Sequence, residues 1–258
     1  WWGEFRIPAD QPAVWHIGPL SMSLLRQKSE WQLRYRVDES DVESEDRCEF
    51  HLPGSALNDS ATSHRYILKF TDDPVMILPA PADRAVITRP ITPVHLTPGQ
   101  EMELYVSTVV WLQIYAFRTG PLLLDMPILR PSDTWFGTST RQGELGYAAR
   151  THARLSVNDV PRRIYRAISS VRIVNRGKTS LLLERVMLPM PYFSVFACSD
   201  GRLWTEALSI VCDEELTSAQ LIFGKGAPTH IRDAALLTPP RKTPERGGLT
   251  RALGAIFG

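Results

Sequence analysis

Residues 19–37 read PLSMSLLRQKSEWQLRYRV, and this stretch indicates the fold class more directly than any other. Apolar and polar residues alternate on both sides of a central polar segment, residues 26–30. The alternating apolar positions are Leu20, Met22, Leu24, Trp31, Leu33 and Tyr35. Successive side chains of a β-strand point to opposite faces, so the alternation predicts two strands, each with one apolar face. With a turn between them, the stretch is a β-hairpin.

The rest of the chain repeats this pattern of short apolar or alternating runs between proline, glycine and polar turns. The runs lie at residues 65–70, 75–80, 85–90, 94–117, 143–155, 170–188 and 192–211. The chain has 20 prolines, which fits strands better than helices because proline is poor inside a helix. We therefore predict a mainly β protein built from immunoglobulin-like β-sandwich units, with helix expected near 160–170 and at the C-terminus. Residues 212–223 could be either helix or strand.

A boundary near residues 118–122 would divide these strands into two β-sandwich-like units of similar size. The expected ranges are 1–118 for the first unit, 119–237 for the second and 238–258 for a linker with a short amphipathic helix. A chain of 258 residues is compatible with one large or two small domains. A single continuous sandwich with insertions is the alternative.

Composition argues against several functional classes. Lys plus Arg is 29 and Asp plus Glu is 28, a net charge of +1 that does not suit a dedicated nucleic-acid binder. Only three cysteines occur, Cys48, Cys198 and Cys212, which favours a reducing, cytoplasmic setting over a disulfide framework. The most apolar window, residues 105–117, is too short to span a bilayer, so no membrane span is expected.

No local motif for catalysis or cofactor binding is present, and we expect no cofactor. The six histidines lack metal-pair spacing, and the glycines lack the spacing of a phosphate loop. Residues 38–49 hold seven acidic side chains, which suits either a cation site or a solvated loop. A metal hydrolase whose site is assembled from distant His, Asp and Glu residues remains the enzymatic alternative.

The clearest candidate for chemistry is a run of cationic residues. If residues 143–155 form one strand, Arg150, His152 and Arg154 share a face, and Arg162, Arg163 and Arg166 follow on a helical turn. Stacked cations repel unless they are solvated or matched by anions. The set therefore predicts an anion or partner-binding site, with an ordinary solvated sheet face as the alternative.

Tryptophans allow one further reading. Trp1, Trp2 and Phe5 would suit a carbohydrate-binding platform or an edge strand that packs into the core. We expect the packed arrangement for them and for Trp111, Trp135 and Trp204.

The last segment, residues 238–258, changes character. Prolines and glycines at 238–248 indicate an extended linker. Four apolar residues then follow with helical spacing: Leu249, Leu253, Ile256 and Phe257. A helix this short orders only against a surface, which would be its own domain, another protein chain or an anionic membrane.

Several stretches of the second half resemble a known family. FGTSTRQGELGYAARTHARL (136–155), SSVRIVNRGKTSLLLERVMLPMPYFSVF (169–196) and GRLWTE (201–206) are similar to a prokaryotic family catalogued only as a domain of unknown function. The resemblance covers residues 1–223 in layout and is strongest over 135–206. The family's members often lie beside genes for small-conductance mechanosensitive channels, and it carries no assigned catalytic residues.

The resemblance implies a protein partner, either a membrane channel or a second copy of the chain. Our leading hypothesis is a non-catalytic cytoplasmic interaction protein, an accessory or regulatory channel subunit that lies at the inner membrane through its partner. The tail and the cationic face would be its contact surfaces.

Overall fold

The computed structural model describes residues 1–38, 47–58, 60–137, 139, 141–243 and 249–257. Half of the chain is strand and 4% is helix, so the predicted mainly β class is confirmed. The chain forms two compact units. Unit 1 comprises 1–80, 110–130 and 163–165, and unit 2 comprises 81–109, 131–162 and 166–258.

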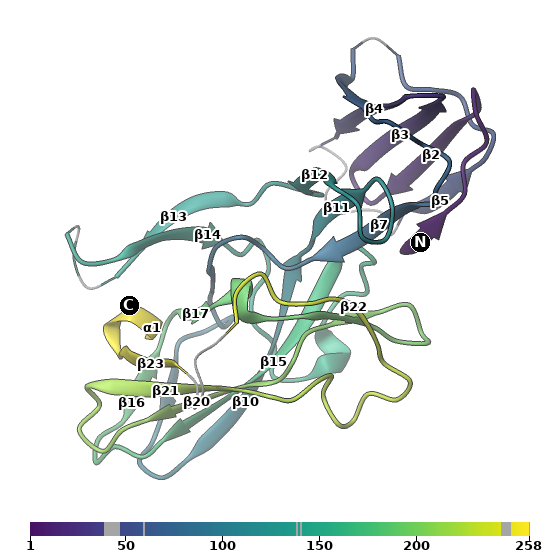
Figure 1. The fold of residues 1–258 in the computed structure, drawn as a ribbon. Coiled ribbons are helices and arrows are strands. Elements are labelled where there is room, and N and C mark those ends of the chain that lie inside the picture. The colour runs from purple at the N-terminus through teal and green to yellow at the C-terminus, as the bar shows by residue number, and fades with distance from the viewer. Residues whose placement is uncertain (39–46, 59, 138, 140, 244–248, 258) are drawn as a thin grey trace. The chain divides into compact units, whose positions relative to one another are not determined.

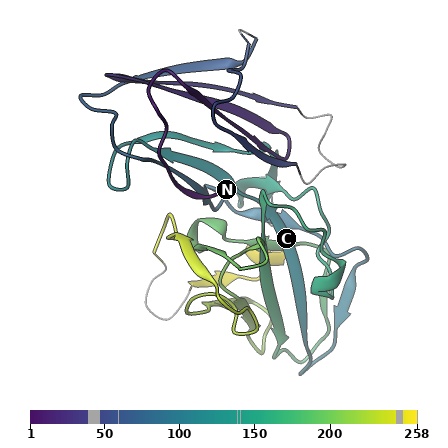
Figure 2. The ribbon, with the colours of Figure 1, turned by 90° about the vertical axis from the view of Figure 1, so that its right-hand side faces the viewer.

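Unit 1 contains two sheets (Figures 1 and 2). The first has the order β1 (Gly3–Phe5), β7 (Val75–Ala80), β11 (Trp111–Tyr115), β12 (Leu122–Pro127). The second has the order β5 (Cys48–His51), β2 (Pro12–Ile17), β3 (Leu20–Gln27), β4 (Glu30–Val37), β6 (Thr62–Ile67). All of these pairings are antiparallel.

The hairpin predicted over 19–37 is confirmed as β3 and β4. Gln27 pairs with Glu30, so the turn is only two residues long. The apolar face of the hairpin is buried, with Trp31 and Leu33 fully inaccessible. Phe5 of one sheet meets Trp15 of the other edge to face, with ring centroids 5.2 Å apart. Unit 1 is therefore a two-layer sandwich with an aromatic core.

Unit 2 contains a large mixed sheet and two smaller ones. The large sheet has the order β22 (Ala235–Thr238), β18 (Val195–Ala197), β19 (Leu203–Trp204), β15 (Arg166–Asn175), β20 (Leu208–Cys212), β21 (Ser218–Phe223), β23 (Leu249–Ala252), with β10 (Glu101–Val109) also on β15. The second sheet has the order β13 (Ser132–Phe136), β14 (Glu144–Ala148), β8 (Val86–Thr88), β17 (Val186–Leu188). A third pairs β16 (Leu181–Leu183) with β9 (Val94–Leu96). Within the described residues, short 3-10 turns lie at Val157–Asp159 and Met190–Tyr192.

The units are not the contiguous ranges expected from the sequence. Strand β10 pairs with β15 over nine residue positions, so residues on both sides of 118 belong to one sheet. The sheets of unit 2 also include parallel pairings, β15 with β19 and β20, and β14 with β8. Immunoglobulin sheets are antiparallel, so the mainly β class is confirmed and the immunoglobulin-like connectivity is not.

One local prediction is wrong because a strand forms where a helix is expected. The helix expected near 160–170 is replaced from Arg166 onward by β15, whose first residues are buried in the sheet. After β15 the chain does not turn back as a hairpin at 175–178, because β16 pairs with β9. In the turn around Asp200, Ala197 lies opposite Leu203.

The C-terminal segment is part strand and part helix. Leu249–Ala252 forms β23 on the edge of the large sheet, and helix α1 is limited to Gly254–Phe257. The expected helix that begins at Leu249 is therefore wrong in its first half, because that half adds a strand to β21.

No helix among the described residues is long and apolar enough to cross a membrane. Most of the acidic run predicted as a cation site or a solvated loop, residues 39–46, lies outside the described residues.

Candidate functional site

Two arginines lie at the same end of one strand pair in unit 2. Strands β8 and β17 are antiparallel, with Thr88 opposite Val186. The next position outward on each strand is Arg89 and Arg185, respectively. Like charges held close together on neighbouring strands are destabilising, so this arrangement needs a compensating interaction.

A third arginine and a histidine lie on the other side of Arg89. Beyond β14 the chain continues beside β8, since the amide of Ala149 donates to the carbonyl of Ile87 over 2.8 Å. The amide of Ala153 donates to the carbonyl of Arg89 over 2.8 Å. The residues between these two anchors, which include Arg150 and His152, are therefore held next to Arg89.

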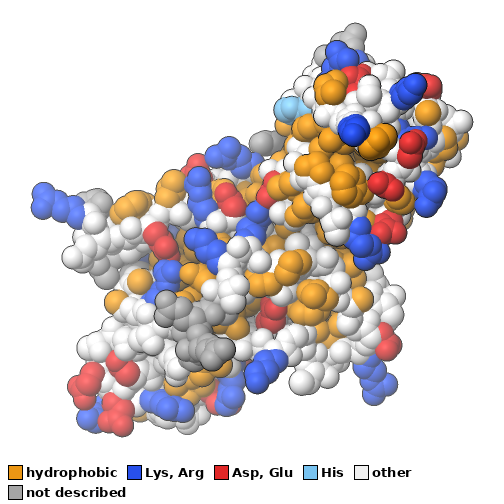
Figure 3. Space-filling view, viewed as in Figure 1, with side chains coloured by type: hydrophobic (Ala, Val, Ile, Leu, Met, Phe, Trp, Pro, Cys, Tyr) orange, Lys and Arg blue, Asp and Glu red, His pale blue; other side chains and the backbone are white. Residues whose placement is uncertain are grey.

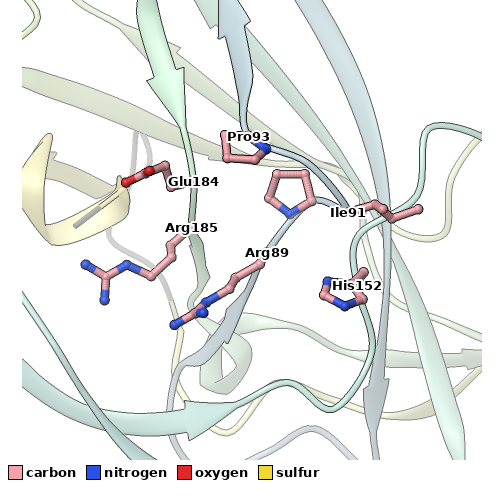
Figure 4. Close-up of a pocket in the computed structure, with 7 residues that line it drawn as sticks. Arg89, Ile91, Pro93, His152, Glu184 and Arg185 are labelled. Carbon is pink, nitrogen blue, oxygen red and sulfur yellow. The ribbon is translucent and has the colours of Figure 1, made fainter.

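These four side chains line two adjoining cavities, which we call the arginine cleft. The larger, of about 430 Å³, is lined by Arg89, His152 and Arg185 together with Pro90, Ile91, Pro93 and Glu184 (Figure 4). The smaller, of about 270 Å³, shares these three basic residues and adds Arg150, Thr134 and Thr151, with Ile87, Ala148 and Ala149. Figure 3 shows basic side chains gathered between the β13–β14 hairpin and β17.

The positive charge of the cleft is poorly matched within the described part of the chain. Arg89 and Arg150 make no ion pair with any described carboxylate. The guanidinium of Arg185 lies over the ring of Phe136, 5.1 Å from its centroid. Glu184 lies at the rim, and in Figure 4 its carboxylate points away from His152. An anion that enters the cleft would therefore meet donors not already occupied by a carboxylate.

A buried arginine holds the wall of the cleft in place. Arg166 is only 7% exposed and donates to the hydroxyl of Ser107 over 2.9 Å and to that of Thr151 over 2.8 Å. The Thr151 hydroxyl donates to the Ser107 carbonyl, and the Thr151 carbonyl accepts from Thr88. This network fixes the residue between Arg150 and His152, which limits the backbone movement of both.

Of the six basic residues predicted from the sequence, two line the cleft and Arg166 supports its wall. Arg150 and His152 line the cleft, whereas Arg154, Arg162 and Arg163 are not among its lining residues. The strand expected over 143–155 ends at Ala148, so the strict alternation assumed for Arg154 does not hold. Arg154 instead pairs through its backbone with Tyr105. Arg163 belongs to unit 1.

The sequence did not indicate Arg89 and Arg185, which complete the cleft. Each lies at the end of a short apolar run, Arg89 after residues 86–88 and Arg185 before 186–188. That position is visible in the sequence, but the pairing of β8 with β17, 98 residues later, is not. Without the pairing, neither arginine stands out from the other basic residues of the chain.

The alternative sites have less support in the described residues. No group of three or more His, Cys, Asp or Glu side chains there is arranged to hold a metal ion. Trp111 and Trp204 are buried, as expected, but Trp135 is 46% exposed opposite Leu145 on the β13–β14 hairpin, so its expected core position is wrong. Trp1 is 50% exposed.

The four tail residues have different environments. Ile256 and Phe257 are buried, and α1 packs against β17 of the same chain. Leu253 donates its amide to the carbonyl of Thr217 over 2.9 Å, and Leu249 pairs with Leu221 on β21. Arg251 forms an ion pair with Glu144 at 2.7 Å. The tail thus contacts its own unit, one of the three surfaces considered for it.

Comparison with known proteins gives the family and nothing more specific. No curated protein and no solved structure shows significant similarity to the chain. One family model, described as "Protein of unknown function (DUF432)", matches residues 1–257. Since that match covers nearly the whole sequence, the chain belongs to this family of proteins of unknown function.

Proposed function

We propose that the protein is a non-catalytic binding module whose arginine cleft recognises an anionic group. The observation that carries the proposal is the row of Arg150, Arg89 and Arg185 on adjacent chain segments, without carboxylate partners for the first two among the described residues. Guanidinium groups are strong donors to phosphate and carboxylate oxygens. A cleft that keeps three of them together gains stability when an anion binds.

In the finer form of this proposal, the protein is an accessory or regulatory subunit of a mechanosensitive channel in the cytoplasm. This form is supported only by the gene neighbourhood of the family that the sequence resembles. The expected result is that the untagged protein co-purifies with the channel from detergent-solubilised membranes. Recovery of the channel without the protein, at matched expression, would remove the channel from the proposal.

Anion recognition is tested by the thermal stability of the full chain. Inorganic phosphate should raise the melting temperature of the wild type at constant ionic strength, because a ligand that binds only the folded state stabilises it. Arg89→Gln and Arg150→Gln should abolish most of that rise. In the absence of anion, Arg89→Gln should leave the melting temperature unchanged or slightly higher, since it removes one of three positive charges that line the same cleft.

Arg232→Gln is the matched control, because Arg232 is an exposed arginine of unit 2 outside the cleft and its loss changes the net charge equally. This variant should retain the full rise in melting temperature. Equal loss in all three variants would mean that phosphate acts through general electrostatics, and the arginine cleft would lose its role.

A further inference from the structure

We infer that the natural ligand of the arginine cleft is a small organic phosphate. Its phosphoryl group would lie on the arginines, and its organic group would lie against a wall formed by Pro90, Ile91 and Pro93. The inference rests on the proposed function, since it names the chemical class of the anion that the cleft recognises.

The charge of the cleft favours a doubly charged group. Arg89, Arg150 and Arg185 supply three positive charges and Glu184 supplies one negative charge, which leaves two positive charges to be matched. A carboxylate carries one negative charge, whereas a phosphate monoester carries nearly two at neutral pH and offers three acceptor oxygens. His152, shared by both cavities, supplies a further ring N–H or acceptor.

The smaller cavity has the character of a phosphoryl site. Its polar lining comes from Arg150, the threonines 134 and 151, and the shared basic residues. The hydroxyl of Thr151 already bonds to Arg166 and Ser107, so it supports the wall. The guanidinium groups of the lining arginines remain as donors, and guanidinium groups can make bidentate contacts with phosphate oxygens.

The larger cavity has a different lining that suits an organic group. Pro90, Ile91 and Pro93 form one side of it, and Ile91 is 59% exposed although it is a large apolar residue. The two prolines restrict the backbone on either side of this residue, so the apolar wall is largely preformed. A volume of about 430 Å³ lies within the range of small-molecule sites, which favours a free metabolite over one side chain of a partner protein.

Isothermal titration calorimetry with four matched probes tests the inference on the full chain. Phenyl phosphate carries both a doubly charged phosphoryl group and a large organic group. Methyl phosphate keeps the phosphoryl group with only a small organic group, and inorganic phosphate has no organic group. Phenylacetate keeps the large organic group but carries a single negative charge. Phenyl phosphate should bind roughly tenfold more tightly than phenylacetate, because it adds charge-assisted hydrogen bonds. It should also bind more tightly than methyl phosphate.

Two variants separate the two halves of the cleft. Arg89→Gln should weaken the binding of all four probes. Ile91→Ser should weaken the binding of phenyl phosphate and leave the affinity for methyl phosphate unchanged. Ile91 is largely exposed, so its replacement leaves the core intact. Arg232→Gln again serves as the charge-matched control and should bind all the probes as the wild type does.

Each contrary outcome has a separate meaning. Absence of binding by every probe, and by vesicles that contain phosphatidic acid, would overturn both the proposed function and this inference. Equal affinity for phenylacetate and phenyl phosphate, both lost in Arg89→Gln, would overturn the inference and leave anion recognition standing. Equal affinity for methyl and phenyl phosphate would show that the apolar wall does not bind an organic group, and would overturn that part of the inference. Binding to vesicles that contain phosphatidic acid, without binding to phenyl phosphate, would replace the small molecule with a lipid headgroup.

Discussion

At the residue scale, polar side chains in unit 2 serve two different purposes. Some, such as Arg166 and Asp213, are satisfied by hydrogen bonds within the chain and maintain the fold. Others, Arg89 and Arg150, are held beside each other without a described carboxylate partner. A cluster of like charges that the fold does not neutralise costs stability, and we propose that a bound anion compensates this cost.

Asp213 allows a test of the first group through pH. Its carboxylate accepts bonds from the hydroxyls and amides of Ser218 and Thr217, and these hydrogen bonds lower its pKa from 3.8 to about 2. A carboxylate whose pKa is lower in the folded state contributes stability above its unfolded pKa and loses it as the pH falls. The wild type should therefore lose stability between about pH 4 and pH 2 by this route.

Asp213→Asn should be less stable than the wild type at pH 7, and its stability should fall less steeply over the acid window. Asp159→Asn, at an exposed carboxylate in a 3-10 turn, is the control and should follow the wild-type profile. Chemical denaturation at a series of pH values measures both. An acid profile for Asp213→Asn parallel to that of the wild type would contradict this role.

The sequence identifies some candidate binding residues, but it does not show which residues lie beside them in the fold. The cationic run was visible at 150–154, and two of its members line the cleft. Arg89 and Arg185 were not found, because the register that brings them to the same end of one strand pair depends on the pairing of distant strands. Trp135 was placed in the core because tryptophan is usually buried, yet it lies exposed beside Leu145.

At the element scale, the sequence predicts the positions of the short strands well, but it predicts poorly which strand pairs with which. The β3–β4 hairpin was found in full, since a two-residue turn leaves no choice of partner. Residues 170–188 also form strands, but β16 and β17 pair with β9 and β8 rather than with β15. Local alternation gives the faces of a strand, and only long-range contacts decide which strand lies beside it.

The tail shows how a neighbouring strand can override helical spacing. Leu249–Ala252 pairs with β21, and only Gly254–Phe257 is helical.

Ile256 is fully buried, so Ile256→Ala should lower the free energy of unfolding by about 2–4 kcal/mol. Thr250→Ala, at an exposed position of β23, should have little effect.

Urea denaturation of the two variants measures this difference. If Ile256→Ala proves as stable as the wild type, the tail does not contribute to the fold of its own unit. The tail would then again be a candidate for docking on another surface, as the sequence had suggested.

At the scale of the whole molecule, the mainly β class followed from composition and pattern, whereas the division into units did not. Unit 1 is built from three separate stretches of the chain and unit 2 from three others. The runs 105–109 and 111–115 look like one apolar segment, yet β10 belongs to unit 2 and β11 to unit 1. A boundary read along the sequence cannot describe units that are interleaved in this way.

The family match adds no activity, so the proposed function rests on the cleft itself. Its lining residues come from four places in the sequence: the segment that begins at the end of β8 with Arg89, Thr134 on β13, the anchored segment with Arg150 and His152, and the residues just before β17 with Arg185. The buried Arg166 supports the wall from behind. All belong to unit 2, which makes this unit the expected recognition domain.

The most direct test of the central claim is anomalous X-ray diffraction from a crystal of the full chain soaked in tungstate, a heavy tetrahedral dianion. If the arginine cleft binds anions, an anomalous peak should appear within hydrogen-bond distance of the guanidinium groups of Arg89 and Arg150. Arg89→Gln crystals soaked in the same way should show no such peak. An empty cleft in the wild-type crystal, with tungstate bound elsewhere or not at all, would contradict the account.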